Sequence, residues 1–173
     1  ALPIWSMATA VYEGTRPLLL EVQALTSPTN IGFARRTAVG VELSRLNMIL
    51  AVLERKAGLI LINQDVYVNV VGGLKPDGTS IDLAVALAIY STCKGLKGSS
   101  RVIAVGEIGL TGDLRSVRNA DKIVREAARM GFTKAILPQK NAARLTDAPG
   151  GIQVVGVNSL REAIQIVQQP IGM

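Results

Sequence analysis

Hydrophobic residues recur along the chain with a spacing that changes repeatedly between two and about three and a half residues. A spacing of two is typical of strands with one buried face, and residues 65–71, with valines at 66, 68 and 70, show it most clearly. Shorter apolar runs bounded by glycine, proline or asparagine indicate further strands. The predicted strands cover residues 18–25, 65–71, 101–105, 114–117, 134–137 and 152–157.

Four other segments repeat their apolar residues at helical spacing. Residues 41–56 carry leucine and isoleucine on one face and arginine and glutamate on the other. Thr79 or Ser80 is predicted to cap a second helix, which runs to about residue 93 and has the carboxylate of Asp82 in its first turn. The last two predicted helices cover residues 119–130 and, after a cap by Asn158 or Ser159, the segment up to about residue 168.

Strands interleaved with helices over 173 residues, 49% of them hydrophobic, suffice for one α/β domain with its own core. The order of the elements does not follow a regular doubly wound pattern, and we expect a two-layer α+β arrangement. The domain is expected to cover residues 1–173. Residues 1–12, which include the apolar Trp5 and Met7, are interpreted as a linker or as an interface segment that packs on a neighbouring copy.

The composition excludes several kinds of site. Without histidine, the chain cannot form Ser-His-Asp, Cys-His or His-metal centres, so any catalysis must use serine, lysine or carboxylates. Cys93 is the single cysteine and lies in an apolar run, which is typical of a small core residue. No Walker-type or GxGxxG turn follows a strand, and no apolar stretch is long enough for a membrane span. We therefore expect no metal, no cofactor and no membrane partner in this chain.

The formal net charge of +6 favours an anionic partner, although a solvated basic face would give the same charge. Aromatic residues make up only 3% of the chain, which argues against a platform on which bases stack. Arg35 and Arg36 precede the first predicted helix in a loop, and a planar guanidinium can bind a phosphate with two parallel hydrogen bonds. The pair is predicted to contact duplex DNA; a solvated or subunit-interface pair is the alternative.

The same surface is expected to include further basic residues near the second helix, namely Lys75, Arg115, Arg118 and Lys122. Arg125, Arg129 and Lys134 are interpreted instead as ordinary solvated charges.

Residues 72–82 (GGLKPDGTSID) resemble the active-site loop of a Lon-type Ser-Lys protease. Six other segments add to this resemblance: residues 13–17, 21–24, 34–40, 45–54, 65–69 and 106–115. Together the segments resemble the C-terminal, Lon-protease-like domain of the RadA (Sms) family of DNA repair proteins. The resemblance covers essentially the whole chain and implies a ribosomal-S5-domain-2-like fold.

The resemblance implies that the domain is an oligomerisation scaffold that forms a hexameric ring and also holds duplex or branched DNA. It implies a parent protein that is a DNA-dependent ATPase and branch-migration helicase, that processes recombination intermediates and that has a RecA-type recombinase as a partner. The zinc finger and the RecA-like ATPase of that family are absent from this chain, so ATP, magnesium and zinc are expected only in those other parts of the parent protein. The implied location is the bacterial cytoplasm and nucleoid, or an organelle interior in a plant.

The catalytic pair of the Lon proteases is incomplete in this sequence. Ser80 stands at the position of the nucleophile, but the position of the lysine base is occupied by Asp121. A serine hydroxyl needs a neighbouring base, and Lys122 is one residue away, which rotates its side chain by about 100° on a helix. Asp82 also stands where Lon proteases carry a small residue. We therefore interpret Ser80 as a helix cap and expect no catalysis; a residual Ser-Lys peptidase is the alternative.

Overall fold

The computed structural model describes residues 5–72, 78–98, 101–146 and 148–168. Its main sheet has the order β3-β4-β2-β1-β5-β8-β9, in which β1 and β4 each pair antiparallel with β2 and the other neighbours are parallel. Its strands are β1 (Trp5–Glu13), β2 (Arg16–Pro28), β3 (Arg36–Val39), β4 (Gln64–Val71), β5 (Val102–Ala104), β8 (Lys134–Pro138) and β9 (Gln153–Val157). A separate hairpin joins β6 (Glu107–Ile108) and β7 (Leu114–Arg115).

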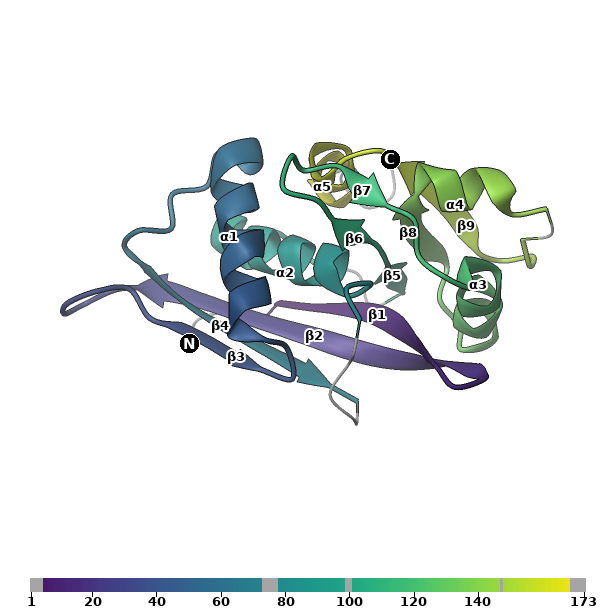
Figure 1. The fold of residues 1–173 in the computed structure, drawn as a ribbon, viewed down its shortest axis with the longest axis horizontal. Coiled ribbons are helices and arrows are strands. Elements are labelled where there is room, and N and C mark those ends of the chain that lie inside the picture. Colours follow the sequence, from purple (N-terminus) through teal and green to yellow (C-terminus); the bar gives the residue numbers. More distant parts are fainter. Residues whose placement is uncertain (1–4, 73–77, 99–100, 147, 169–173) are drawn as a thin grey trace.

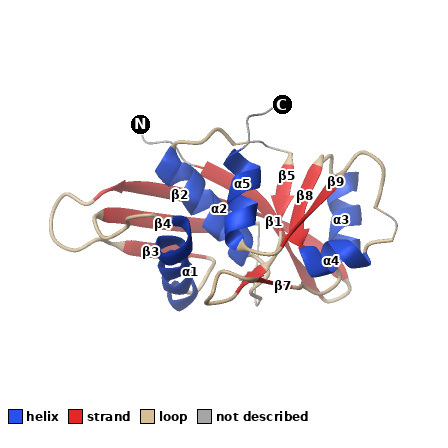
Figure 2. Ribbon diagram, turned by 90° about the horizontal axis from the view of Figure 1, so that it is seen from above, coloured by secondary structure: helices blue, strands red, loops and turns tan. Residues whose placement is uncertain are grey.

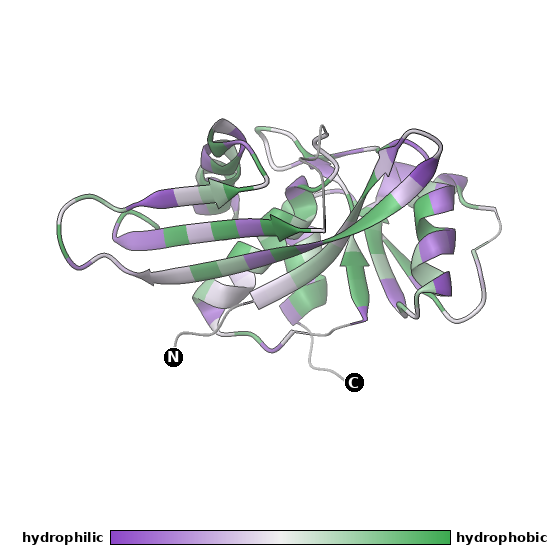
Figure 3. Cartoon of the chain, turned by 90° about the horizontal axis from the view of Figure 1, so that it is seen from below, coloured by the Kyte–Doolittle hydropathy of each residue, from purple (hydrophilic) through white to green (hydrophobic). Residues whose placement is uncertain are grey.

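The helices lie on both faces of this sheet. They are α1 (Leu43–Ala57), α2 (Asp82–Lys94), α3 (Ala120–Arg129), α4 (Gln139–Arg144) and α5 (Leu160–Gln168). The first two and α5 cover one face, whereas α3 and α4 flank the parallel strands from the other side (Figures 1 and 2). No described helix covers the opposite face of β3 and β4, where hydrophilic and hydrophobic positions alternate (Figure 3).

The predicted α/β class is confirmed. The side chains of each parallel strand point alternately to the two faces of the sheet, which explains why this half of the sheet has a layer of helices on each side. In β5, Ile103 packs into the cluster under α3, while its neighbour Ala104 packs into the cluster under α2. Ala135 and Ile136 of β8 divide in the same way. Buried positions on both faces of short parallel strands are expected when helices cover both sides.

The interpretation of residues 1–12 as a linker or interface segment is wrong for residues 5–12. They belong to β1, an internal strand that pairs with β2 along its whole length and with β5 on its other side. Trp5 and Met7 are buried within the chain, and the indole N–H of Trp5 donates to the carbonyl oxygen of Leu96 at 3.0 Å. The apolar residues of this segment therefore complete the core of their own chain.

Most predicted elements are present with their ends shifted by one to three residues, and Ser159 caps α5 by accepting the amide of Glu162 at 3.2 Å. Cys93 is half-buried against the core, as predicted. Besides β1, three further elements were not predicted: β3, β6 and α4. Each is short, with two to six residues, so its sequence carries too few apolar positions to show a period.

Candidate functional site

Ser80 lies in the turn before α2 and lines a hollow of about 730 Å³. The hollow is bounded by the end of β1, by residues 78–80 and by the loop 116–119. Two backbone hydrogen bonds attach the turn to the sheet: Gly106 donates to the carbonyl oxygen of Ser80 at 2.8 Å, and Leu83 donates to that of Gly106 at 3.0 Å. In this position the Ser80 hydroxyl donates to the carbonyl oxygen of Ala10 at 3.2 Å.

The interpretation of Ser80 or Thr79 as a helix cap is therefore wrong. The residue before α2 is Ile81, and it has a helical backbone and makes no side-chain cap. The hydroxyl of Ser80 is turned toward β1, where it donates to Ala10, and the turn that carries it is held by the backbone of Gly106.

Asp121 and Lys122, at the start of α3, do not complete a catalytic pair with Ser80. Asp121 is exposed and lines a second hollow, which shares the wall formed by residues 116–119 with the first. Lys122 points to Tyr12: its Nζ lies 3.1 Å from the Tyr12 hydroxyl and 5.4 Å from the centre of the ring. Within the described part of the chain, the only hydrogen bond of the Ser80 side chain is that to Ala10.

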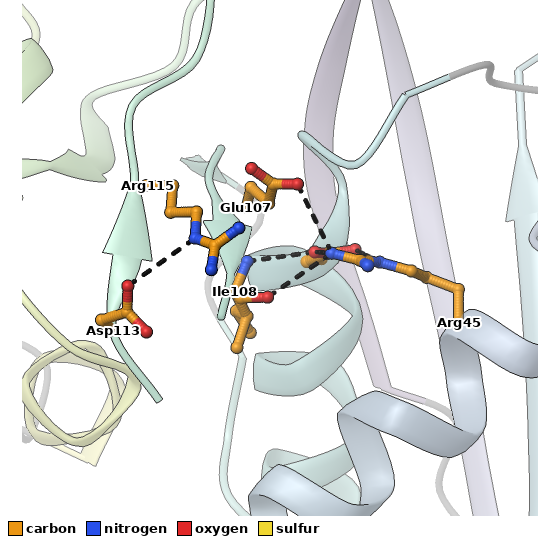
Figure 4. Close-up of polar contacts among 6 residues, drawn as sticks. Arg45, Glu107, Ile108, Asp113 and Arg115 are labelled. Carbon is orange, nitrogen blue, oxygen red and sulfur yellow. Dashed lines mark hydrogen bonds and ion pairs between the residues drawn. The ribbon is translucent and has the colours of Figure 1, made fainter. Parts of the chain in front are cut away.

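A buried ion pair lies next to the Ser80 turn and was not foreseen from the sequence. Arg45 reaches from α1 to Asp82, at the start of α2, and contacts both oxygens of its carboxylate (Figure 4). The Nε of Arg45 lies 2.9 Å from Oδ1, and the backbone N–H of Ile108 donates to Oδ2 at 3.0 Å. The side chain of Asp82 is 0% exposed and that of Arg45 is 29% exposed. Glu107 adds a second carboxylate, 3.8 Å from Arg45.

Burial raises the pKa of Asp82 above its ordinary value, while the hydrogen bonds from Arg45 and Ile108 lower it. The hydrogen bond to Asp82 raises the pKa of Arg45, which keeps this guanidinium charged.

A signal for the pair exists in the sequence: α2 is apolar on all sides, and a lone carboxylate in a fully buried helix requires a partner. The sequence does not identify that partner, because Arg45 lies 37 residues away.

Arg35 and Arg36 lie together at one end of the sheet but have different surroundings. The backbone N–H of Arg35 donates to Asp65 at 2.8 Å, and its side chain is exposed. The guanidinium of Arg36 is directed inward and donates to the carbonyl oxygens of Gln64 and Leu61, the latter at 2.8 Å. Arg36 therefore holds the loop that presents Arg35. The backbone hydrogen bond from Arg35 also lowers the pKa of Asp65.

The predicted basic residues do not form one surface. Arg36 donates to Gln64, which pairs with the last residue of β2. Lys122 contacts Tyr12, which pairs with a residue near the start of the same strand. The strand has 13 residues, so its ends are about 40 Å apart at ~3.3 Å per residue.

The remaining predicted contacts lie toward the Tyr12 end or outside the described residues. Arg118 lines the Ser80 hollow, and Arg115 lies on β7, where its Nε is 3.8 Å from Asp113 (Figure 4). Lys75 lies outside the described residues.

Three further features of the described residues bear on the kind of site. Among the described residues, no group of three or more His, Cys, Asp or Glu could hold a metal ion. None of the described helices is long and apolar enough to cross a bilayer. Burial raises the pKa of the Cys93 thiol, which disfavours the thiolate needed for nucleophilic chemistry.

Comparison with known proteins gives two findings. Residues 28–141 match the family described as Subunit ChlI of Mg-chelatase. The chain is also 44% identical over 161 residues to DNA repair protein RadA of Halalkalibacterium halodurans. The identity is 46% over 162 residues to the protein of that name from Streptococcus pyogenes serotype M1, and 44% over 160 residues to that from Bacillus subtilis. These matches cover 92–94% of this chain but 35–36% of the relatives, so the chain spans about a third of their length. The expected similarity to RadA proteins is confirmed.

Proposed function

Because the chain belongs to the family described as Subunit ChlI of Mg-chelatase and resembles part of the RadA proteins, we propose that it is a non-proteolytic, DNA-binding part of a RadA-type repair protein. In this proposal it is the Lon-protease-like domain, with a ribosomal-S5-domain-2-like fold. It serves as a scaffold for self-association and binds duplex or branched DNA through phosphates. The ATPase and helicase activities of the parent protein belong to other parts of that protein. Its ATP, magnesium and zinc are bound in those parts as well.

The observation that carries the non-proteolytic role is the hydrogen bond from Ser80 to the carbonyl oxygen of Ala10. Acyl transfer requires a base that takes the proton from the serine hydroxyl, and a carbonyl oxygen cannot do so. The cation nearest in sequence to the vestigial position, Lys122, is engaged with Tyr12 instead.

A fluorophosphonate probe tests this role directly, because it labels only an activated serine. We expect no labelling of the wild-type chain and no cleavage of unfolded protein substrates. The Ser80→Ala variant serves as the control. Stoichiometric labelling that disappears in Ser80→Ala would establish the alternative, a residual Ser-Lys peptidase.

Support for DNA binding comes from the surroundings of Arg35. Its loop is attached to the start of β4, since Thr29 and Arg35 both donate to Asp65, at 2.9 and 2.8 Å. The guanidinium of Arg35 makes no hydrogen bond or ion pair within the described residues and is free to bind a phosphate. Arg36 contributes by fixing the loop, because two of its donors are already used by backbone carbonyls.

The contribution of Arg35 is measured by salt titration of binding to a duplex of arbitrary sequence. Arg35→Ala is expected to make the slope of log affinity against log salt shallower by about 0.9, the value for one phosphate contact. Arg55→Ala is the matched control, because Arg55 is exposed in the last turn of α1. Equal slopes for the two variants, together with a changed molecular mass for Arg35→Ala, would identify Arg35 as a subunit-interface residue.

Self-association is supported by exposed apolar side chains around Arg35. Four large residues from two adjacent loops are 74–96% exposed there: Ile31, Phe33, Ile60 and Ile62. Exposed groups of this kind commonly mark protein interfaces. We propose that they contact a neighbouring copy in a ring, with six copies as the expected number.

Light scattering at high concentration tests this: the double variant Phe33→Ser with Ile62→Ser should lower the molecular mass, whereas Leu110→Ser, at another exposed apolar position, should not. A mass that is monomeric for wild type would contradict the proposal.

A further inference from the structure

Three arginines from different elements line one hollow of about 620 Å³ at the α3–α4 end of the molecule. Arg118 comes from the loop before α3, Arg125 from α3 itself and Arg144 from the last turn of α4. Both helices lie at the side of the parallel strands that faces away from α1 (Figures 1 and 2). The sequence alone predicts only an ordinary solvated charge at Arg125.

None of these three guanidiniums has a hydrogen-bond or ion-pair partner in the part of the chain that the structure describes. Arg129, one turn further along α3, shows the contrast, because it forms an ion pair with Glu126 and donates to it through Nε at 3.0 Å. A cluster of like charges is unfavourable unless an anion joins it. The unpaired arginines therefore have the properties of a receptor for an anion.

The wall of the hollow is fixed by a buried amide. Asn141 of α4 is 7% exposed, and its side chain makes two hydrogen bonds with the backbone of Val117. It accepts from the Val117 N–H at 2.8 Å and donates to the Val117 carbonyl oxygen at 2.9 Å. This contact joins α4 to the loop that carries Arg118. The backbone next to Arg118 is thus held against α4 before any ligand arrives, which lowers the entropy lost on binding.

The first turn of α3 also lines the hollow, through residues 119–121. Backbone amides at a helix start favour an anion, in the same sense as the arginines. The carboxylate of Asp121 opposes it, so the charges around the hollow are three positive and one negative.

We propose that this hollow is a phosphate-binding site, in which Arg118, Arg125 and Arg144 contact the oxygens of a phosphate group. The inference deepens the proposed function and rests on it for the source of the phosphate, which would be the DNA backbone. It places a second phosphate contact at the end of the sheet opposite to Arg35. A free nucleotide or inorganic pyrophosphate offers the same chemistry and can be compared directly.

The test uses two ligands and matched variants of the chain. Pyrophosphate is titrated while the Nε–H resonances of the arginines are followed by NMR, and duplex DNA is titrated with salt by anisotropy. Arg125→Ala and Arg144→Ala should each weaken pyrophosphate binding, and the two substitutions together should make the DNA salt slope shallower by about 0.9, the value for one phosphate. Arg129→Ala, whose charge is already paired, should change neither quantity.

A gain in affinity separates binding from damage to the fold. Asp121→Asn should bind pyrophosphate about fivefold more tightly, the effect expected when one unit charge about 4 Å away in water is removed. Binding of pyrophosphate with no response to Arg125→Ala, Arg144→Ala or Asp121→Asn would overturn the inference, and so would no binding at all. If duplex DNA binds but these variants behave like Arg129→Ala, the hollow is refuted and the proposed function stands. If pyrophosphate binds in the hollow but duplex DNA does not bind the chain, the hollow stands and the proposed function fails.

Discussion

Replacing Arg45 by methionine should destabilise the chain strongly, because it leaves the carboxylate of Asp82 buried without a countercharge. The side chain of Asp82 is 0% exposed, and after the substitution its described donor is the Ile108 amide at 3.0 Å. Removing one partner of a buried pair typically costs about 3–5 kcal/mol of unfolding free energy. For a chain of this length that loss corresponds to a fall in Tm of about 6–20 °C.

The loss should depend on pH, and its sign follows from the pKa of Asp82. Burial already raises that pKa, and without the hydrogen bond from Arg45 it should rise further above the unfolded value of about 3.9. A carboxyl group whose folded pKa is raised loses stability as pH rises through the interval between the two values. The effect of Arg45→Met should therefore be largest at neutral pH and small below about pH 4.

Urea unfolding checks this reasoning with four variants: Arg45→Met, Arg55→Met, Asp82→Asn and the double variant Arg45→Met with Asp82→Asn. Arg55→Met, on the same helix but exposed, should stay within about ±0.5 kcal/mol of wild type. Adding Asp82→Asn to Arg45→Met should recover part of the loss, with an interaction energy of about 0.5–3 kcal/mol in the double-mutant cycle. If Arg45→Met behaves like Arg55→Met at every pH, the pair does not support the fold and the reasoning is refuted.

Three further predictions concern the core and the wall of the hollow lined by Arg118, Arg125 and Arg144. Trp5→Ala should cost about 3–5 kcal/mol of unfolding free energy, because β1 is internal and the indole is hydrogen-bonded to Leu96. In the wild-type chain, the emission of this single tryptophan should shift to the red on unfolding; a solvent-like emission from the folded chain would contradict this. Asn141→Ala should lower the unfolding free energy by about 1–3 kcal/mol, since it leaves the N–H and carbonyl of Val117 without their partner; an unchanged urea midpoint would show that the contact is dispensable. Cys93 should react slowly with a thiol reagent in the folded chain, with a rate that rises at higher pH than for free cysteine, because burial raises its pKa; equal rates before and after unfolding would refute this.

The elements that the sequence predicts correctly are those whose own residues contain a period. The valines of β4 alternate over eight residues, and α1 repeats its leucines on one buried face, so each segment could be recognised alone. β1 was missed although it is nine residues long, because alanine, serine and threonine occupy four of its nine positions and give a weak alternation. Its identity as a strand is settled by pairing with β2 and β5, which no local pattern contains.

The candidate site was predicted in its residue types better than in its geometry. The sequence indicates that Ser80 lacks a base, but the bond to Ala10 connects residues 70 positions apart and depends on how the turn is held. Arg35 and Arg36 are equivalent in sequence, yet one is exposed and the other donates inward, since Arg36 begins β3 beside the end of the α1–β4 loop. Arg125 and Arg144 line one hollow although they lie on different helices, and the contact of Asn141 with Val117 that joins α4 to the loop before α3 cannot be read from either segment alone.

The salt dependence of duplex binding by the unmodified chain tests the central claim, DNA binding through phosphates, most directly. If Arg35 and the hollow lined by Arg118, Arg125 and Arg144 each neutralise one phosphate, log affinity should fall linearly with log salt with a slope of about −1.8, and further contacts would make it steeper. Duplexes of unrelated sequence should give the same slope and affinities that agree closely, because phosphates carry no sequence information. An affinity that does not change with salt, or the absence of binding at low salt, would contradict the account.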